Sequence, residues 1–166
     1  MMTRIRNASA EDLALVTVAL CGALLFGALL LEHVLGLVPC PLCLMQRVWF
    51  CIAGLFAVAG LLHEPRWGIY PLLTMVASLV GGGFAIRQLY LQSLPADQVP
   101  ACGPGIDYMF EAFPLSEVLA AMTRGTGDCA EVAGSFLGIS IPGWALLGFA
   151  LVIALAVLQI RAGNRG

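Results

Sequence analysis

The sequence predicts an all-α membrane protein, a bundle of four transmembrane helices joined by one short and one long loop on the same side. Of its 166 residues, 60% are hydrophobic and only 11% are charged, whereas about a quarter of a soluble domain is charged. Four windows reach the roughly 20 apolar residues that a helix needs to cross a hydrocarbon core of about 30 Å. The net charge of −2 excludes a broad basic surface for nucleic acid.

Charged residues divide the chain into four expected spans, at residues 13–31, 44–62, 67–86 and 141–160. The second window contains one charge, Arg47, near its start, and the other three contain none. Helices are the expected spanning form because lipid offers no partner for backbone polar groups. Four spans in so short a chain predict a single integral membrane domain over residues 1–166, with the first apolar run retained as a helix.

The arginines predict the orientation of the bundle. With four spans, both tails and the middle loop lie on one side, and these segments hold five of the eight arginines: Arg4, Arg6, Arg66, Arg161 and Arg165. The positive-inside rule then places both termini in the cytoplasm. Two loops, at residues 33–43 and 88–140, lie on the other side, which is the periplasm if the chain sits in a bacterial inner membrane.

Four of the six cysteines fall on the expected periplasmic side: Cys40, Cys43, Cys102 and Cys129. The other two, Cys21 and Cys51, lie within apolar helix, where a thiol acts as a small hydrophobe. An even set of cysteines in a disulfide-permissive compartment suggests two local disulfides, Cys40–Cys43 and Cys102–Cys129. On spacing alone, the second pair also fits a purely stabilising disulfide.

The stretch "VPCPLCLMQR", residues 38–47, has the composition of a redox site. A C-x-x-C pair is usually redox-active or metal-binding. Because proline suits a first helical turn, we expect a helix to begin near Pro41, which puts Cys43 where the helix N-terminus favours an anion. Arg47 follows one turn later on the same face. Both effects favour the thiolate of Cys43, although snorkelling to the interface also explains Arg47.

A dithiol at the membrane edge needs an electron acceptor. The sequence has no haem-attachment C-x-x-C-H, iron–sulfur spacing or nucleotide-binding glycine pattern. A lipid-soluble quinone that reaches the first turn of the second span is therefore the expected acceptor. The alternative is a metal-binding membrane protein, with the four outer cysteines as a zinc or copper site. It is disfavoured because the chain has one C-x-x-C and no histidine near the loop cysteines.

Three further features have expected structural roles. The long loop should carry a short amphipathic helix over residues 116–122, which suits the membrane surface or packing on the bundle. The three glycines at 81–83 should let helices approach closely, with Ala77 and Gly81 as a small-xxx-small pair. Glu32 and His33 should anchor the end of the first span at the interface.

The stretches "VPCPLCLMQR", "LYLQSLP", "CGPG", "GDCAE" and "FLGISIPGW", in this order, resemble the DsbB family, the inner-membrane disulfide bond formation protein B. They cover most of the chain from Val38 to Trp144. The resemblance implies a protein-dithiol:quinone oxidoreductase with no metal. Such an enzyme reoxidises a periplasmic thioredoxin-like oxidase of the DsbA type and passes the electrons to ubiquinone or menaquinone.

The resemblance also implies roles for single residues. Cys102 would form the mixed disulfide with the reduced partner, and Cys129 would exchange with Cys102 and link transiently to Cys40. Cys43 would contact the quinone as a thiolate. The implied quinone-binding residues, besides Cys43, are Arg47, Gln46, Gln88 and Arg87.

Two positions depart from the family pattern. Family members often have histidine near Gln88, so Arg87 or Gln88 is the expected substitute, and they often have an aromatic residue at Ser135. Two related enzymes are alternatives: a DsbB paralogue with a dedicated partner, and a vitamin-K-epoxide-reductase-like oxidoreductase. The second is disfavoured because its C-x-x-C is expected in a later helix.

Overall fold

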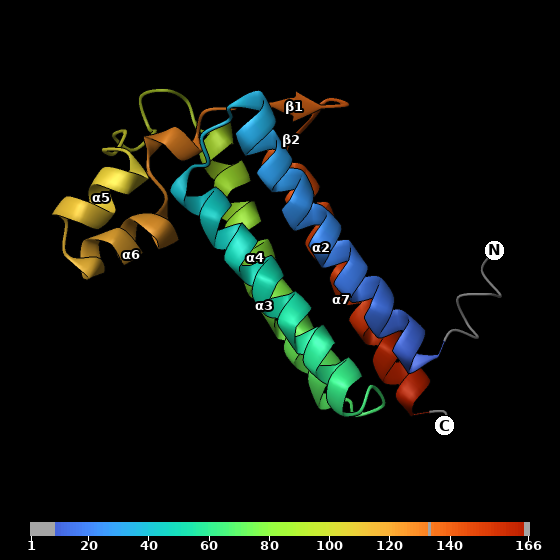
Figure 1. Cartoon of the computed structure of the whole chain (residues 1–166). Helices are drawn as coiled ribbons and strands as arrows, with labels where there is room; N and C mark the ends of the chain where they lie inside the picture. Colours follow the sequence, from blue (N-terminus) through green and yellow to red (C-terminus); the bar gives the residue numbers. More distant parts are fainter. Residues whose placement is uncertain (1–8, 133, 165–166) are drawn as a thin grey trace.

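The computed structural model describes residues 9–132 and 134–164, and its main body is a bundle of long helices (Figure 1). The four long helices are α2 (Ala10–Leu35), α3 (Pro41–His63), α4 (Ile69–Ser93) and α7 (Ile141–Gly163). Each is long and apolar enough to cross a membrane. The all-α, four-helix membrane fold is therefore confirmed. Three of the arginines that predict its orientation, Arg4, Arg6 and Arg165, lie outside the described residues.

Local sequence signals explain where the helices begin and end. Ser9 caps α2 by accepting a hydrogen bond from the Asp12 N–H, and the Asp12 carboxylate accepts one from the Ser9 N–H. Gly36 ends the same helix in the left-handed conformation, with φ of 66°. α4 begins at Ile69, two residues after the expected window, because Trp67 and Gly68 belong to the turn after α3.

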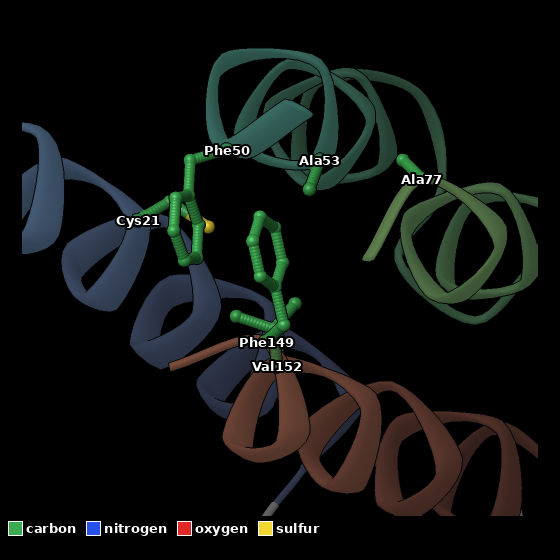
Figure 2. Close-up of a cluster of buried hydrophobic side chains, with 6 residues drawn as sticks. All are labelled: Cys21, Phe50, Ala53, Ala77, Phe149 and Val152. Atoms are coloured by element: carbon green, nitrogen blue, oxygen red, sulfur yellow. The ribbon is translucent and has the colours of Figure 1, made fainter. Parts of the chain in front are cut away.

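The four helices form a ring in the order α2, α3, α4, α7, in which each packs against two neighbours. At the centre, the rings of Phe50 and Phe149 stack with centroids 3.8 Å apart and planes within 3°. Cys21, Ala53, Ala77 and Val152 complete this cluster (Figure 2). Large apolar side chains such as Leu55, Leu79 and Leu151 are exposed on the outside. The helices are thus apolar both in the core and on the exposed surface of the bundle, as expected for helices surrounded by lipid.

The segment after α4 lies at one end of the bundle (Figure 1). It contains α5 (Ile106–Ala112), α6 (Leu115–Arg124), the 3₁₀ turn η1 (Gly127–Cys129) and the short strands β1 (Ser135–Phe136) and β2 (Ile139–Ser140). The strands pair antiparallel. α6 lies where the amphipathic helix is expected, and α5 is a second helix that the sequence pattern does not predict. We call this end, where α2 ends and α3 begins, the cysteine end.

α4 packs tightly against its neighbours at Gly81. A Cβ added there would lie 2.8 Å from the Cβ of Trp49 and closer still to the Phe149 ring, which is fully buried. Two positions along the helix, Gly83 is exposed and a Cβ there would meet nothing within 4 Å. Gly81 therefore sets the spacing of α4 against α3 and α7.

These two glycines provide a matched test of the packing. We expect Gly81→Ala to destabilise the bundle by about 1–3 kcal/mol, because the added methyl overfills a core that cannot yield. Gly83→Ala should be neutral or stabilise by up to about 1 kcal/mol through helix propensity. Thermal unfolding in detergent measures both. An equal effect of the two substitutions would contradict the packing argument.

Candidate active site

Cys40 and Cys43 lie together at the N-terminus of α3. Cys40 is the residue that caps the helix, with extended backbone, and Pro41 occupies the first turn. The Cys43 N–H donates to the Cys40 sulfur over 3.4 Å, and the two sulfurs lie 2.9 Å apart. Both are free thiols in this structure. The expected Cys40–Cys43 disulfide stays a prediction, and the geometry requires little movement to form it.

Two buried glutamines lie beside this pair: Gln88 contacts the sulfurs, and Gln46 contacts Gln88. Gln88 of α4 donates through Nε2 to the sulfur of Cys40 over 3.3 Å and to that of Cys43 over 3.2 Å. Gln46 of α3 donates through Nε2 to Oε1 of Gln88 over 2.7 Å. Their exposed fractions are 4% for Gln46 and 3% for Gln88. The structure thus places the Gln88 amide at the sulfurs and links the Gln46 amide to it across the α3–α4 interface.

Cys129 ends the turn η1 and is fully buried. It packs with Leu42 and Leu91, and Cys40 lies against the same cluster. Contact with the Cys40 thiol, together with backbone N–H groups, lowers the pKa of Cys129 to about 6 despite its burial. The pKa of Cys40 is raised, because its hydrogen bonds to Cys129 and then to Cys43, together with burial, favour its protonated form. Cys129 is thus the more acidic partner of this contact.

Cys102 lies on the outer side of the same turn. Its side chain is exposed, and the neighbouring Ala101 carbonyl accepts a hydrogen bond from the Gly127 N–H over 3.1 Å. A hydrogen bond from the thiol to the Asp128 carboxylate, with the negative charge of that carboxylate, raises the pKa of Cys102. Cys102 and Cys129 therefore face opposite environments, one water and one the protein interior. Their expected disulfide also stays a prediction.

Cys43 also forms part of the wall of an apolar cavity of about 310 Å³. It lies between α2, α3 and α7, and most of its wall is aliphatic. Cys43, Gln46 and Arg47 line it from α3, and Trp144 lines it from α7. A cavity of this size, with a few polar groups in a mostly apolar wall, suits a small ring-shaped ligand.

Arg47 has a partner that the sequence analysis did not assign to it. Its guanidinium forms a salt bridge with Glu32 of α2 and donates to the Ala28 carbonyl over 3.2 Å. Both charged side chains line the cavity. A half-buried cation in a membrane span needs an anionic partner. The sequence offered one in the carboxylate of Glu32, at the end of the first span.

Arg87 lies outside the cavity wall. It is exposed, donates through Nε to the Arg124 carbonyl over 3.2 Å and lies 5.5 Å from the ring centroid of Tyr90. These contacts hold the end of α6 against α4. Ser135 lies in β1. The carbonyl of the next residue in that strand, Phe136, accepts a hydrogen bond from the Trp144 indole N–H.

Within residues 9–132 and 134–164, the structure holds no group of three or more His, Cys, Asp or Glu side chains placed to bind a metal ion. The cysteines at this end of the bundle form a row of sulfurs. Cys129 contacts Cys40, Cys40 contacts Cys43, and Cys43 lines the cavity. Such an arrangement suits disulfide exchange between neighbouring sulfurs.

Comparison with known proteins agrees with this chemistry. The model of the family described as "Disulfide bond formation protein DsbB" matches residues 10–159. A disulfide bond formation protein B of Marinobacter nauticus is 55% identical over 140 residues, which are 82% of this chain and 83% of that protein. One of Hahella chejuensis is 57% identical over 125 residues, 74% of this chain and 76% of that protein.

A further relative, disulfide bond formation protein B 1 of Pseudomonas aeruginosa, is 43% identical over 155 residues, 92% of this chain and 95% of that protein. No solved structure matches the chain. The family resemblance of the sequence motifs is thus confirmed. Because the match covers α2, α3 and α4 in full and α7 as far as residue 159, the chain belongs to the DsbB family and is a disulfide-forming oxidoreductase of the membrane.

Proposed function

We propose that this protein is a thiol:quinone oxidoreductase of the bacterial inner membrane, which reoxidises a periplasmic oxidase of the DsbA type. One observation carries the proposal: Cys43 belongs both to the row of sulfurs and to the wall of the apolar cavity. Electrons that reach this sulfur from the protein side can leave it on the lipid side. The sulfur row and the cavity are two halves of one path.

The cavity fits a quinone head group. Its aliphatic wall suits an uncharged ring, Trp144 offers an aromatic face, and Arg47 offers a donor for a ring oxygen. When bound, a quinone accepts two electrons and two protons. Cys43, Arg47 and Gln46 are the polar residues that would face it from α3. Ubiquinone and menaquinone share this chemistry, and both fit the proposal.

Each transfer on the protein side is a thiol–disulfide exchange, which breaks one S–S bond and forms another. A thiolate of the reduced partner attacks Cys102, the exposed cysteine, and releases Cys129. Cys129 then attacks Cys40 and releases Cys43 as a thiolate. Backbone N–H groups beside Cys129 lower its pKa even when Cys40 carries no thiol proton, and the thiolate that they favour is the attacking species in this order of steps.

Two further exchanges complete the proposed cycle. The partner's second thiol attacks the partner's other sulfur, which is bonded to Cys102 in the mixed disulfide. This attack forms the disulfide of the oxidised partner and releases Cys102. Cys102 then attacks Cys129 and releases Cys40. Two electrons now reside on Cys40 and Cys43, and they leave towards the cavity as the Cys40–Cys43 bond forms again.

We place both termini in the cytoplasm and the cysteine end in the periplasm. Arg66 lies in the turn between α3 and α4, and its carbonyl approaches Gly163 at the end of α7. Arg161 lies in the last turn of α7. These cations mark the end of the bundle opposite the cysteines, which supports a cytoplasmic position for that end.

The decisive experiment follows quinone reduction by purified protein that is supplied with a reduced DsbA-type partner. We expect Cys43→Ser to abolish turnover, because the last sulfur before the cavity is removed. Cys51→Ser is the matched control: it lies on the same helix, is exposed on the outer face and should retain full turnover. Comparable rates for the two variants would show that the path does not run through Cys43.

A second experiment separates electron entry from electron exit. Cys102→Ala should block turnover with the protein partner, because the exposed sulfur that forms the mixed disulfide with that partner is lost. The same variant should still reduce quinone when a small dithiol reduces the Cys40–Cys43 pair directly. Quinone absorbance in the two assays gives the comparison. Full activity with the protein partner would remove Cys102 from the proposed path.

A further inference from the structure

Gln88 has a fixed orientation at the redox pair. A glutamine amide can present either oxygen or N–H₂, and here the choice is set by Gln46, whose N–H lies 2.7 Å from Oε1 of Gln88. Oε1 of Gln88 also lies 3.6 Å from the sulfur of Cys43, but the N–H₂ group makes the shorter contacts, 3.3 Å to the sulfur of Cys40 and 3.2 Å to that of Cys43. The two glutamines therefore form a directed chain of hydrogen bonds from α3, through α4, to the sulfurs.

The chain is also sheltered from competing partners. Both amides are at least 95% buried, and they lie in the interface between two membrane-spanning helices. A hydrogen bond to a charged group is strong in such surroundings, because no water takes its place when it is lost. A thiolate released at this point can accept a hydrogen bond from the Gln88 N–H₂ group, which is already oriented towards it.

We propose that Gln88 is a catalytic residue that stabilises the thiolate formed when the Cys40–Cys43 bond opens, and that Gln46 is the positioning residue that orients it. The proposal rests on the proposed function, and it assigns Gln88 to the sulfurs instead of the quinone. When the disulfide takes up two electrons, the S–S bond breaks, one sulfur binds a proton and the other keeps the negative charge. The N–H₂ group of Gln88 donates to the charged sulfur.

The consequence is a bias in the equilibrium of the pair. A donor that binds the thiolate more strongly than the disulfide favours the reduced form, so it makes Cys40–Cys43 a better electron acceptor from Cys129. Removing the donor should shift the thiol–disulfide equilibrium towards the disulfide. This equilibrium is a property of the two sulfurs and needs no quinone.

The test uses the full chain with Cys102→Ser and Cys129→Ser, in quinone-free detergent and glutathione buffers. The reduced fraction of Cys40–Cys43 is read by thiol alkylation and mass spectrometry. We expect Gln88→Met, which keeps the length of the side chain, to shift the equilibrium constant about tenfold towards the disulfide. Gln88→Glu keeps the acceptor for Gln46 but removes the donor and should shift it further in the same direction.

Two comparisons distinguish this role from a general effect on folding. As a single substitution, Gln46→Met should shift the equilibrium towards the disulfide. In the Gln88→Met background it should cause almost no further shift, because Gln46 acts through Gln88. Gln159→Met is the matched control: Gln159 is a buried glutamine of α7 that donates to the Pro65 carbonyl over 3.1 Å at the opposite end. It should leave the equilibrium unchanged.

A Gln88→Met variant that folds and keeps its equilibrium constant within about twofold overturns the inference, and so does an equal shift in Gln159→Met. Thermal unfolding in the same detergent reports whether each variant folds. Failure of quinone reduction in the unsubstituted protein would instead overturn the proposed function and leave this equilibrium result standing. The two proposals therefore fail separately.

Discussion

The central constraint on this molecule is the cost of a charged sulfur beside lipid. A thiolate at the start of a membrane-spanning helix has little water to solvate it, so the protein must supply the donors. Here they come from the free N-terminus of α3 and from the amide of Gln88 on the neighbouring helix. The Gln88 amide lies on α4 and the sulfurs lie at the start of α3, so this donor depends on the packing of the two helices, to which Gly81 contributes.

The same constraint explains how charge is handled across the cavity. Arg47 is held by Glu32 instead of standing as a free cation, so the pair adds polar groups to the cavity wall with little net charge. Cys43 and the ion pair are among the few polar groups of a wall that is otherwise mostly aliphatic. A neutral ligand from the bilayer fits such a space better than an ion does.

The sequence predicted the features that depend on local patterns. Hydropathy gave the four spans, and the proline beside the C-x-x-C gave the start of α3, because both are properties of consecutive residues. The contacts of Gln88 join residues 42 to 48 positions apart, and the pairing of Glu32 with Arg47 joins residues 15 positions apart. Both depend on how the helices rotate against each other. The α5 helix was missed because prolines and glycines around it resemble an irregular loop.

The burial of Cys129 has a further implication. With none of its surface accessible, this sulfur is closed to glutathione and other small thiols that diffuse through the surrounding solution. Only a sulfur carried in by the chain itself, or by movement of the turn that holds it, comes within bonding distance. Small reductants in solution therefore meet Cys102 at the surface, whereas Cys129 reacts only with a sulfur that the fold brings to it.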